Sequence, residues 1–199
     1  MVMSFKKTFR DTARQVLKDP AIRVARIKYT GNRLNAECDW YKVRNPVRTM
    51  FAAFVFTILR YTPPMKLKNS IYRLFGVKLG KDVAIAYNCF FDPLHPELVE
   101  IGDGTLVGSD CEFASHSIVN TFWELGRCKI GKNCMIGAYS LVGAGITIGD
   151  NVVLGAKSMP TKDIPSNQFW AGTPAKLIRE TGVKELKMEK DVEIVHYEK

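Results

Sequence analysis

The chain has 199 residues, 46% hydrophobic and 25% charged, which is ordinary for a soluble globular protein and argues against a disordered chain. Its five cysteines are odd in number and show no Cys-x-x-Cys spacing, so they indicate neither a disulfide framework nor a zinc site. The net charge of +9 is unevenly divided, because residues 1–73 carry 16 Lys and Arg against 4 Asp and Glu, whereas residues 74–199 carry 13 against 16. The first part is therefore expected to face an anionic partner.

The first segment, Ser4 to Lys18, is predicted to form an amphipathic helix that Ser4 caps and Asp19-Pro20 ends. Phe5 and Phe9 begin its apolar face, which Lys and Arg side chains surround. The stretch from Met1 to Asp11 is basic and no apolar run follows it, so a signal peptide is not expected. The sequence thus predicts a cytoplasmic protein.

Two further helices are predicted over Val47 to Arg60 and Leu67 to Phe75. The apolar run inside the first is too short to span a bilayer, which needs about 20 residues. Cations bracket this run: Arg44, Arg48, Arg60, Lys66, Lys68 and Arg73. Either these helices lie in a membrane interface, at the inner face of the membrane, or they cover the end of the core or a neighbouring subunit. Nucleic acid is not an expected partner, because no binding motif is present and the aromatic residues are not interleaved with the cations.

From Leu79 onward an apolar residue followed by a small one recurs every six residues. The repeated apolar residues are Leu79, Ile85, Phe91, Ile101, Val107, Phe113, Val119, Ile130, Ile136, Val142, Ile148 and Leu154. A fixed period of six is neither helical nor a simple strand alternation, and it predicts a coil that stacks on itself, a parallel β-helix. The apolar residues then point inward and stack on their equivalents in neighbouring coils, roughly 4.8 Å away.

This repeat and the ending that follows it, Pro160 to Pro165 and Ala171 to Lys176, resemble the hexapeptide-repeat acyltransferases that acetylate maltose and galactosides on a hydroxyl. The resemblance covers roughly Gly76 to Glu180 and implies a left-handed β-helix and a homotrimer with active sites between subunits. We therefore expect a mainly β protein in three parts. These are a basic helical extension over 1–75, a left-handed β-helix domain over 76–172, and a short C-terminal helix with a charged tail over 173–199.

His116 is the candidate catalytic residue. In the resembling family, a histidine just before an inserted loop is the catalytic base, and here Thr121 to Lys129 break the sixes shortly after His116. A sugar hydroxyl is a poor nucleophile, and a base that titrates near neutrality can take its proton as the oxygen attacks. In the predicted loop, Trp123 is a candidate to stack on the acceptor, and Glu124 to orient the base or hold a hydroxyl. His95, flanked by prolines, is interpreted as part of a rigid corner loop.

The resemblance also implies the position of the acyl donor. Family positions that contact coenzyme A match Ala138, Ala156, Thr161, Lys162, Lys176 and Arg179. Coenzyme A is long and polyanionic, so it suits a groove between coils with cations at its phosphate end. Lys157 stands where the family usually has glycine, and Met159-Pro160 where two β-branched residues are usual, so the local shape beside the donor is expected to differ. No metal is implied.

These features predict an acetyl-CoA-dependent O-acetyltransferase acting on a hydroxyl of a sugar or glycan, lipid-linked if the N-terminal helices bind membrane. One alternative, a zinc carbonic anhydrase of the same fold, needs three histidines around one metal at a spacing that this chain lacks. The other is a catalytically silent scaffold whose basic extension binds a membrane or a partner. Affinity for acetyl-CoA separates this scaffold from the enzyme.

Overall fold

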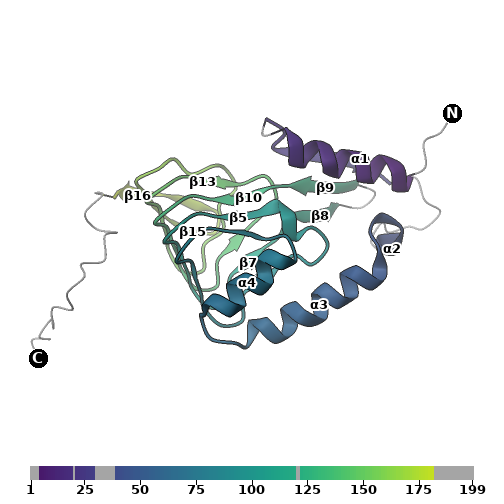
Figure 1. Cartoon of the computed structure of the whole chain (residues 1–199). Helices are drawn as coiled ribbons and strands as arrows, with labels where there is room; N and C mark the ends of the chain where they lie inside the picture. Colours follow the sequence, from purple (N-terminus) through teal and green to yellow (C-terminus); the bar gives the residue numbers. More distant parts are fainter. Residues whose placement is uncertain (1–4, 20, 30–38, 120–121, 182–199) are drawn as a thin grey trace, which may run out of the picture.

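The computed structural model describes residues 5–19, 21–29, 39–119 and 122–181. Figure 1 shows a β-helix with a β-hairpin projecting from it, and four helices from the first part of the chain. Helix α1 (Phe5–Lys18) lies along the hairpin, and α3 (Pro46–Arg60) runs along the lower edge of the view. Helix α4 (Lys66–Leu74) lies between α3 and the β-helix, and α2 (Trp40–Val43) is a single turn before α3.

Three parallel sheets form the walls of the β-helix. Wall 1 contains β2 (Lys78–Leu79), β5 (Val99–Ile101), β10 (Cys128–Ile130) and β13 (Thr147–Ile148). Wall 2 contains β3 (Ala84–Ile85), β6 (Leu106–Val107), β11 (Met135–Ile136), β14 (Val153–Leu154) and β15 (Gln168–Gly172). Wall 3 contains β4 (Phe90–Phe91), β7 (Glu112–Phe113) and β12 (Leu141–Val142). The chain visits the walls in the order 1, 2, 3 through the first three coils, and the fourth coil has strands in walls 1 and 2 only.

The repeated apolar residues stack in columns inside these walls. In wall 2 the register places Ile85, Val107 and Ile136 in successive coils, all buried. In wall 3 the rings of Phe91 and Phe113 stack with centroids 5.0 Å apart. Each coil thus buries its apolar residue against the coils above and below, which provides the hydrophobic stabilisation of the fold.

Some corners between walls leave no room for a side chain. A Cβ on Gly137 would lie 2.4 Å from the backbone nitrogen of Ala156 in the next coil. Other corners turn through the left-handed region of backbone conformation, and at one of them Lys157 has φ 54°. Glycine adopts that conformation without strain, which explains why it is usual there in the resembling family.

Both interruptions of the repeat fall at one corner, between wall 3 and wall 1. The first contains the short 3₁₀ helix η2 (Pro96–Leu98). The second is a β-hairpin of β8 (His116–Val119) and β9 (Phe122–Gly126), where the sequence predicted a protruding loop. Val119, counted among the repeated apolar residues, lies in β8 instead, because the chain leaves the wall at His116 and pairs with β9.

The N-terminal extension is built onto this hairpin. Strand β1 (Val24–Lys28) was not predicted; it pairs antiparallel with β9 and makes the hairpin a three-stranded sheet. Helix α1 buries Ala13 in a cluster with Trp123 and Leu125 of the hairpin, and its Val16 is also buried. The Arg127 guanidinium donates hydrogen bonds to the carbonyl oxygens of Val16 (2.5 Å) and Leu17 (2.6 Å), which caps the C-terminus of α1. Ser4, the predicted N-cap, lies outside the described residues.

Helices α3 and α4, which begin within one residue of their predicted starts, cover the first coil of the β-helix. The Tyr72 ring of α4 lies 4.6 Å from the Phe91 ring and 5.1 Å from the Phe56 ring of α3, measured between centroids. Lys68, predicted among the cations that flank the apolar run, is buried. Its Nζ donates to the carbonyl oxygens of Thr62, Ile85 and Ala86 at 3.0–3.1 Å, so it fastens α4 to the first coil.

The end of the described chain differs from the prediction of a C-terminal helix. Residues Ala175–Glu180 form strand β16, which pairs antiparallel with β15 and extends wall 2. Because β15 is the last parallel strand of wall 2, its outer edge would have unpaired backbone groups, and β16 pairs with them. The remaining predicted tail, 182–199, lies outside the described residues. Among the residues the structure describes, no helix is long and apolar enough to cross a membrane.

Candidate active site

His116 begins β8 at the corner where the chain leaves wall 3. Its Nδ1 lies 2.5 Å from Oδ2 of Asp92, which directly follows β4 one coil below. The His116 side chain is 23% exposed, whereas the Asp92 side chain is completely buried. A buried carboxylate therefore holds an imidazole that can reach solvent.

Asp92 is held as a carboxylate by its neighbours. Burial by itself disfavours the charged form, but hydrogen bonds from His116, Ser115 and the Leu94 backbone amide outweigh it, and the pKa of Asp92 lies below its ordinary value. An ionised Asp92 accepts the Nδ1–H of His116 and fixes the neutral tautomer, so Nε2 carries the lone pair. Asp92 thus orients the His116 imidazole and sets its tautomer.

The loop between Asp92 and β5 links the surroundings of His116 to the extension. His95 is buried in this loop, in keeping with its interpretation as structural, and its carbonyl oxygen lies 3.1 Å from the Ser115 Oγ. Nδ1 of His95 contacts Glu97 at 3.3 Å, and both guanidinium nitrogens of Arg44, which follows α2, contact the Glu97 carboxylate at 2.9 and 3.0 Å. Burial opposes ionisation of Glu97, yet the His95 hydrogen bond and the Arg44 charge place its pKa below the ordinary value.

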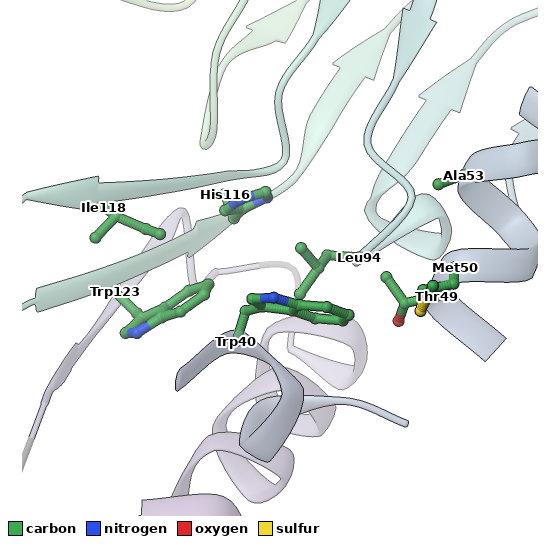
Figure 2. Close-up of a pocket in the computed structure, with 8 residues that line it drawn as sticks. All are labelled: Trp40, Thr49, Met50, Ala53, Leu94, His116, Ile118 and Trp123. Carbon is green, nitrogen blue, oxygen red and sulfur yellow. The ribbon is translucent and has the colours of Figure 1, made fainter. Parts of the chain in front are cut away.

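A pocket of about 290 Å³ opens beside His116. It is lined by Trp40, Thr49, Met50, Ala53, Leu94, His116, Ile118 and Trp123. Figure 2 shows the two tryptophan rings on one side of His116 and the α3 residues across from them. The Trp123 ring stacks on the imidazole with centroids 5.8 Å apart and planes 27° from parallel. The extension contributes half of the lining through α2 and α3, so the pocket is absent from the β-helix alone.

Of the two candidates in the predicted loop, the structure brings only Trp123 to His116. Glu124 lies on the other face of the hairpin, because adjacent residues of a strand point to opposite sides. Its Oε1 pairs with Arg26 of β1 at 2.6 Å, and its Oε2 accepts from Ser117 at 2.9 Å. The orienting role considered for Glu124 is therefore filled by Asp92, which the sequence analysis missed. A signal was present, since Asp92 occupies the small position of its repeat, where most coils have glycine or alanine.

The buried cysteines offer no nucleophile. Burial raises the pKa of the Cys111 thiol to about 12 and that of Cys134 to about 11, and the pKa values of Cys89 and Cys128 are also raised, chiefly by burial. A thiol that stays protonated is a weak nucleophile. The four thiols instead fill small interior positions of the coils. Within the described ranges, no group of three or more His, Cys, Asp and Glu side chains is placed to hold a metal ion.

The donor candidates occupy two corners of the β-helix. Ala138 and Ala156 lie one above the other at the corner between walls 2 and 3, and Lys176 of β16 pairs with Ala171 in the next coil at this corner. Thr161 and Lys162 lie instead at the His116 corner, two coils or roughly 10 Å further along the axis. All but Ala138, which is half-buried, are exposed, as is Arg179, also on β16.

Two cations among the donor candidates, Lys162 and Arg179, contact aromatic rings at the C-terminal end of the β-helix. Nζ of Lys162 lies 5.2 Å from the Trp170 ring centroid, and the Arg179 guanidinium lies 5.7 Å from that of Phe169. At the His116 corner the N-terminal extension contacts the β-helix. Arg23 donates to the Gly145 carbonyl oxygen at 2.7 Å, and its guanidinium lies 3.3 Å from Asp163.

A parallel β-helix that carries an oriented histidine beside a pocket is the arrangement of an acyl-transfer enzyme of the hexapeptide-repeat class. A family model described as "Bacterial transferase hexapeptide (six repeats)" matches residues 127–159. A relative from Bacillus subtilis, named "Putative acetyltransferase YvoF", is 31% identical over 125 residues, which cover 62% of this chain and 73% of the relative.

Two solved structures share the fold. A maltose O-acetyltransferase from Clostridium difficile is 23% identical with a TM-score of 0.57, over 68% of this chain and 87% of that one. A hexapeptide-repeat acetyltransferase from Vibrio cholerae, solved with acetyl coenzyme A, is 18% identical with a TM-score of 0.59, over 68% and 88% of the two chains. The chain thus belongs to the hexapeptide-repeat acetyltransferases, and its fold is the left-handed β-helix predicted from the repeat and the ending.

Proposed function

We propose that this protein transfers the acetyl group of acetyl-CoA to a hydroxyl of a sugar or glycan, with His116 as the general base and no covalent enzyme intermediate. The His116–Asp92 pair carries the proposal. It joins a buried carboxylate to an imidazole at the border of a pocket, which is the geometry that general-base catalysis needs. In this pocket the partly exposed Trp40 ring provides a flat face for a sugar ring.

In the proposed reaction, Nε2 of His116 takes the proton of the acceptor hydroxyl while the hydroxyl oxygen attacks the thioester carbonyl of acetyl-CoA. The new C–O bond forms as the C–S bond breaks, and the proton on Nε2 passes to the leaving thiolate of coenzyme A. Asp92 stabilises the transient imidazolium, because the Nδ1–H bond to an ionised carboxylate strengthens as the ring becomes positive. Each turnover returns His116 to the neutral tautomer.

The donor residues fit coenzyme A in their chemistry. Lys162, Lys176 and Arg179 are exposed cations near the C-terminal end of the β-helix, where the phosphates of the donor would be neutralised. Ala138 and Ala156 are small, and they leave the corner between walls 2 and 3 open for the narrow pantetheine arm. His116 lies at a different corner of the same chain. We therefore propose a homotrimer, in which the alanine corner of one subunit faces the His116 corner of the next.

Replacing the base tests the reaction. We expect His116→Ala to lower kcat about 10³-fold, the range usual for loss of a general base. The assay offers acetyl-CoA with a panel of sugars and glycans and follows release of the coenzyme A thiol. Removing the imidazole leaves the buried Asp92 carboxylate with only its Ser115 and Leu94 donors, so the thermal midpoint should fall, and the assay is run well below the midpoint of the variant. Turnover near the wild-type rate with a productive acceptor would refute His116 as the base.

Calorimetry tests the donor site without knowledge of the acceptor. We expect wild-type protein to bind acetyl-CoA and Lys162→Ala to bind it more weakly. The matched control is Lys81→Ala, which removes an exposed lysine from the opposite end of the β-helix. Absence of binding by the wild type would contradict the proposed function and favour the alternative, a catalytically silent scaffold.

A further inference from the structure

The outward surface of α3 is apolar along its whole length. Its large exposed residues are Val47, Met50, Phe51, Phe54, Ile58 and Tyr61, each between 52% and 76% exposed. Their spacing of three and four residues gathers them on one face of the helix. The opposite face, with Thr49, Ala52, Phe56 and Leu59, is the buried one. A helix that covers a protein core normally has a polar outer surface, so this second apolar face, called the α3 outer face here, points to a partner.

Charge indicates which partner. Residues 40–75 contain seven Lys and Arg and no Asp or Glu. Lys68 is used inside the fold and Arg44 pairs with Glu97, whereas Arg48 is exposed in the first turn of α3 and Lys66 is exposed at the start of α4. An apolar helix face with cations at its ends suits the headgroup region of an anionic membrane, which takes up the apolar side chains and attracts the cations. Helix α3 has 15 residues, so it can lie in that interface but not span it.

The two N-terminal helices with apolar faces, α1 and α3, differ in how far these faces are buried. Helix α1 shows the same sequence pattern, an apolar face among cations, but its Ala13 packs against the hairpin and its Val16 is buried. Of these two apolar helix faces, the one on α3 is exposed.

The α3 outer face continues into the pocket beside His116. Met50 is 64% exposed on that face and also lines the pocket, as do its neighbours Thr49 and Ala53. Figure 2 shows these three residues on α3, on the side of the pocket away from Trp123. An apolar path thus leads from the surface of α3 to the catalytic base.

We propose that the α3 outer face seats the protein on an anionic lipid surface, with the pocket at the edge of the contact. The evidence for the lipid contact is the exposed apolar face of α3 and the cations near it. Its consequence for the acceptor rests on the proposed function: the acetylated hydroxyl belongs to a glycan carried on a lipid, whose apolar part enters along α3.

Vesicle sedimentation of the full chain tests the contact. Vesicles of equal phosphatidylcholine and phosphatidylglycerol should carry the protein down at low salt. Vesicles of phosphatidylcholine alone, or high salt, should release most of it, because the cations are then unpaired or screened. We expect Phe51→Gln with Phe54→Gln to weaken the partition about tenfold or more, since two large apolar side chains no longer enter the lipid.

The matched control is Leu177→Gln with Ile178→Gln, which replaces two exposed apolar residues of β16 and should leave the partition unchanged. Light scattering without lipid measures the oligomeric state and so tests the alternative that the α3 outer face is a subunit interface. If the α3 variant changes the oligomeric state, the face is a subunit interface and the proposal is overturned. It is also overturned if the wild type binds neither vesicle or binds both equally.

Calorimetry with acetyl-CoA keeps this proposal separate from the proposed function. Retained donor binding in the α3 variant would show that its loss of lipid binding is local. Failure of the wild type to bind acetyl-CoA would contradict the proposed function and leave the lipid result standing.

Discussion

The walls of the β-helix and the N-terminal extension bury their apolar residues in different ways. In the walls, each residue rests on its equivalent one coil away, as Val107 does between Ile85 and Ile136. In the extension, α1 and β1 are buried against a hairpin about 100 positions later in the chain. In the walls, each coil therefore packs on the next, so a packing defect in one coil also affects its neighbours. The extension contacts the rest of the chain at fewer positions. Damage to the walls should cost the whole fold, and damage to the attachment should cost only the pocket.

The largest effect is expected from Gly137→Ala in the walls. The new Cβ would meet the backbone of Ala156 at 2.4 Å, and backbone cannot move aside as a side chain can. We expect the free energy of unfolding to fall by about 3 kcal/mol, the upper part of the range for overpacking, measured by urea denaturation. Gly143→Ala is the control, because its Cβ would meet only a Leu141 methyl at 3.9 Å. Equal losses in the two variants would contradict the close-stacking account.

Asp92→Asn affects the junction of the two regions. The amide cannot act as the charged acceptor for Nδ1–H, so His116 loses its fixed tautomer and the stabilisation of its imidazolium. We expect kcat to fall about 100-fold, within the range for a group that supports a general base. Asp110→Asn, which alters a carboxylate bonded to Asn88 away from the pocket, should keep activity. A variant with full activity would show that Asp92 has only a structural role.

Acid denaturation gives an independent measure of the same carboxylate. The pKa of Asp92 is lower in the folded protein than in the unfolded chain, so the unfolded chain binds the proton more readily. The stabilisation by Asp92 is then complete above the unfolded pKa of about 3.9 and is lost as the pH falls through the folded value. Stability of the wild type should fall more steeply below pH of about 4 than that of Asp92→Asn. Parallel curves would argue against the lowered pKa.

The smallest effect should follow from Arg127→Ala at the attachment of the extension. This change leaves the Val16 and Leu17 carbonyl oxygens at the end of α1 without their guanidinium donor. We expect a loss of about 1–2 kcal/mol, confined to the extension. Hydrogen exchange should quicken in α1 and remain slow in walls 1 to 3. Arg26→Ala, which removes a mostly exposed ion pair with Glu124, is the milder control. Faster exchange throughout the walls would show that the two regions unfold together.

The same contrast explains what the sequence could predict. The repeat has a fixed period, so Ile85, Phe113 and Leu154 were assigned to the interior from their spacing alone. His116 was chosen because the resembling family has a histidine just before such an interruption, and its catalytic role stays a prediction. Strand β1 has no such signal: it is five residues long, and its partner β9 lies in a segment predicted as a loop. The pocket was not predicted for the same reason, since Trp40 and Met50 reach His116 only through the docking of the extension.

The charged candidates show a different limit. Lys68 and Lys66 are two residues apart, yet one is buried on three carbonyl groups and the other is exposed. Helical spacing places Lys68 on the face of Ile71 and Tyr72 and Lys66 on the opposite face, but the sequence analysis treated both only as cations flanking the apolar run. Asp92 and Glu124 were likewise two available carboxylates, and only the path of the hairpin selects Asp92 as the partner of His116.

Because β1 pairs with β9, its sheet can form only after β9 has been synthesised. Arg26 leaves the ribosome 98 residues before Glu124, its partner. At about 5–20 residues per second, β1 and the helix before it wait roughly 5–20 s for the strand that completes their sheet. For that interval α1 exposes to the cell an apolar strip that the finished protein hides. A nascent chain arrested before residue 122 should therefore bind chaperones, or an anionic membrane, through a surface that the mature protein no longer presents.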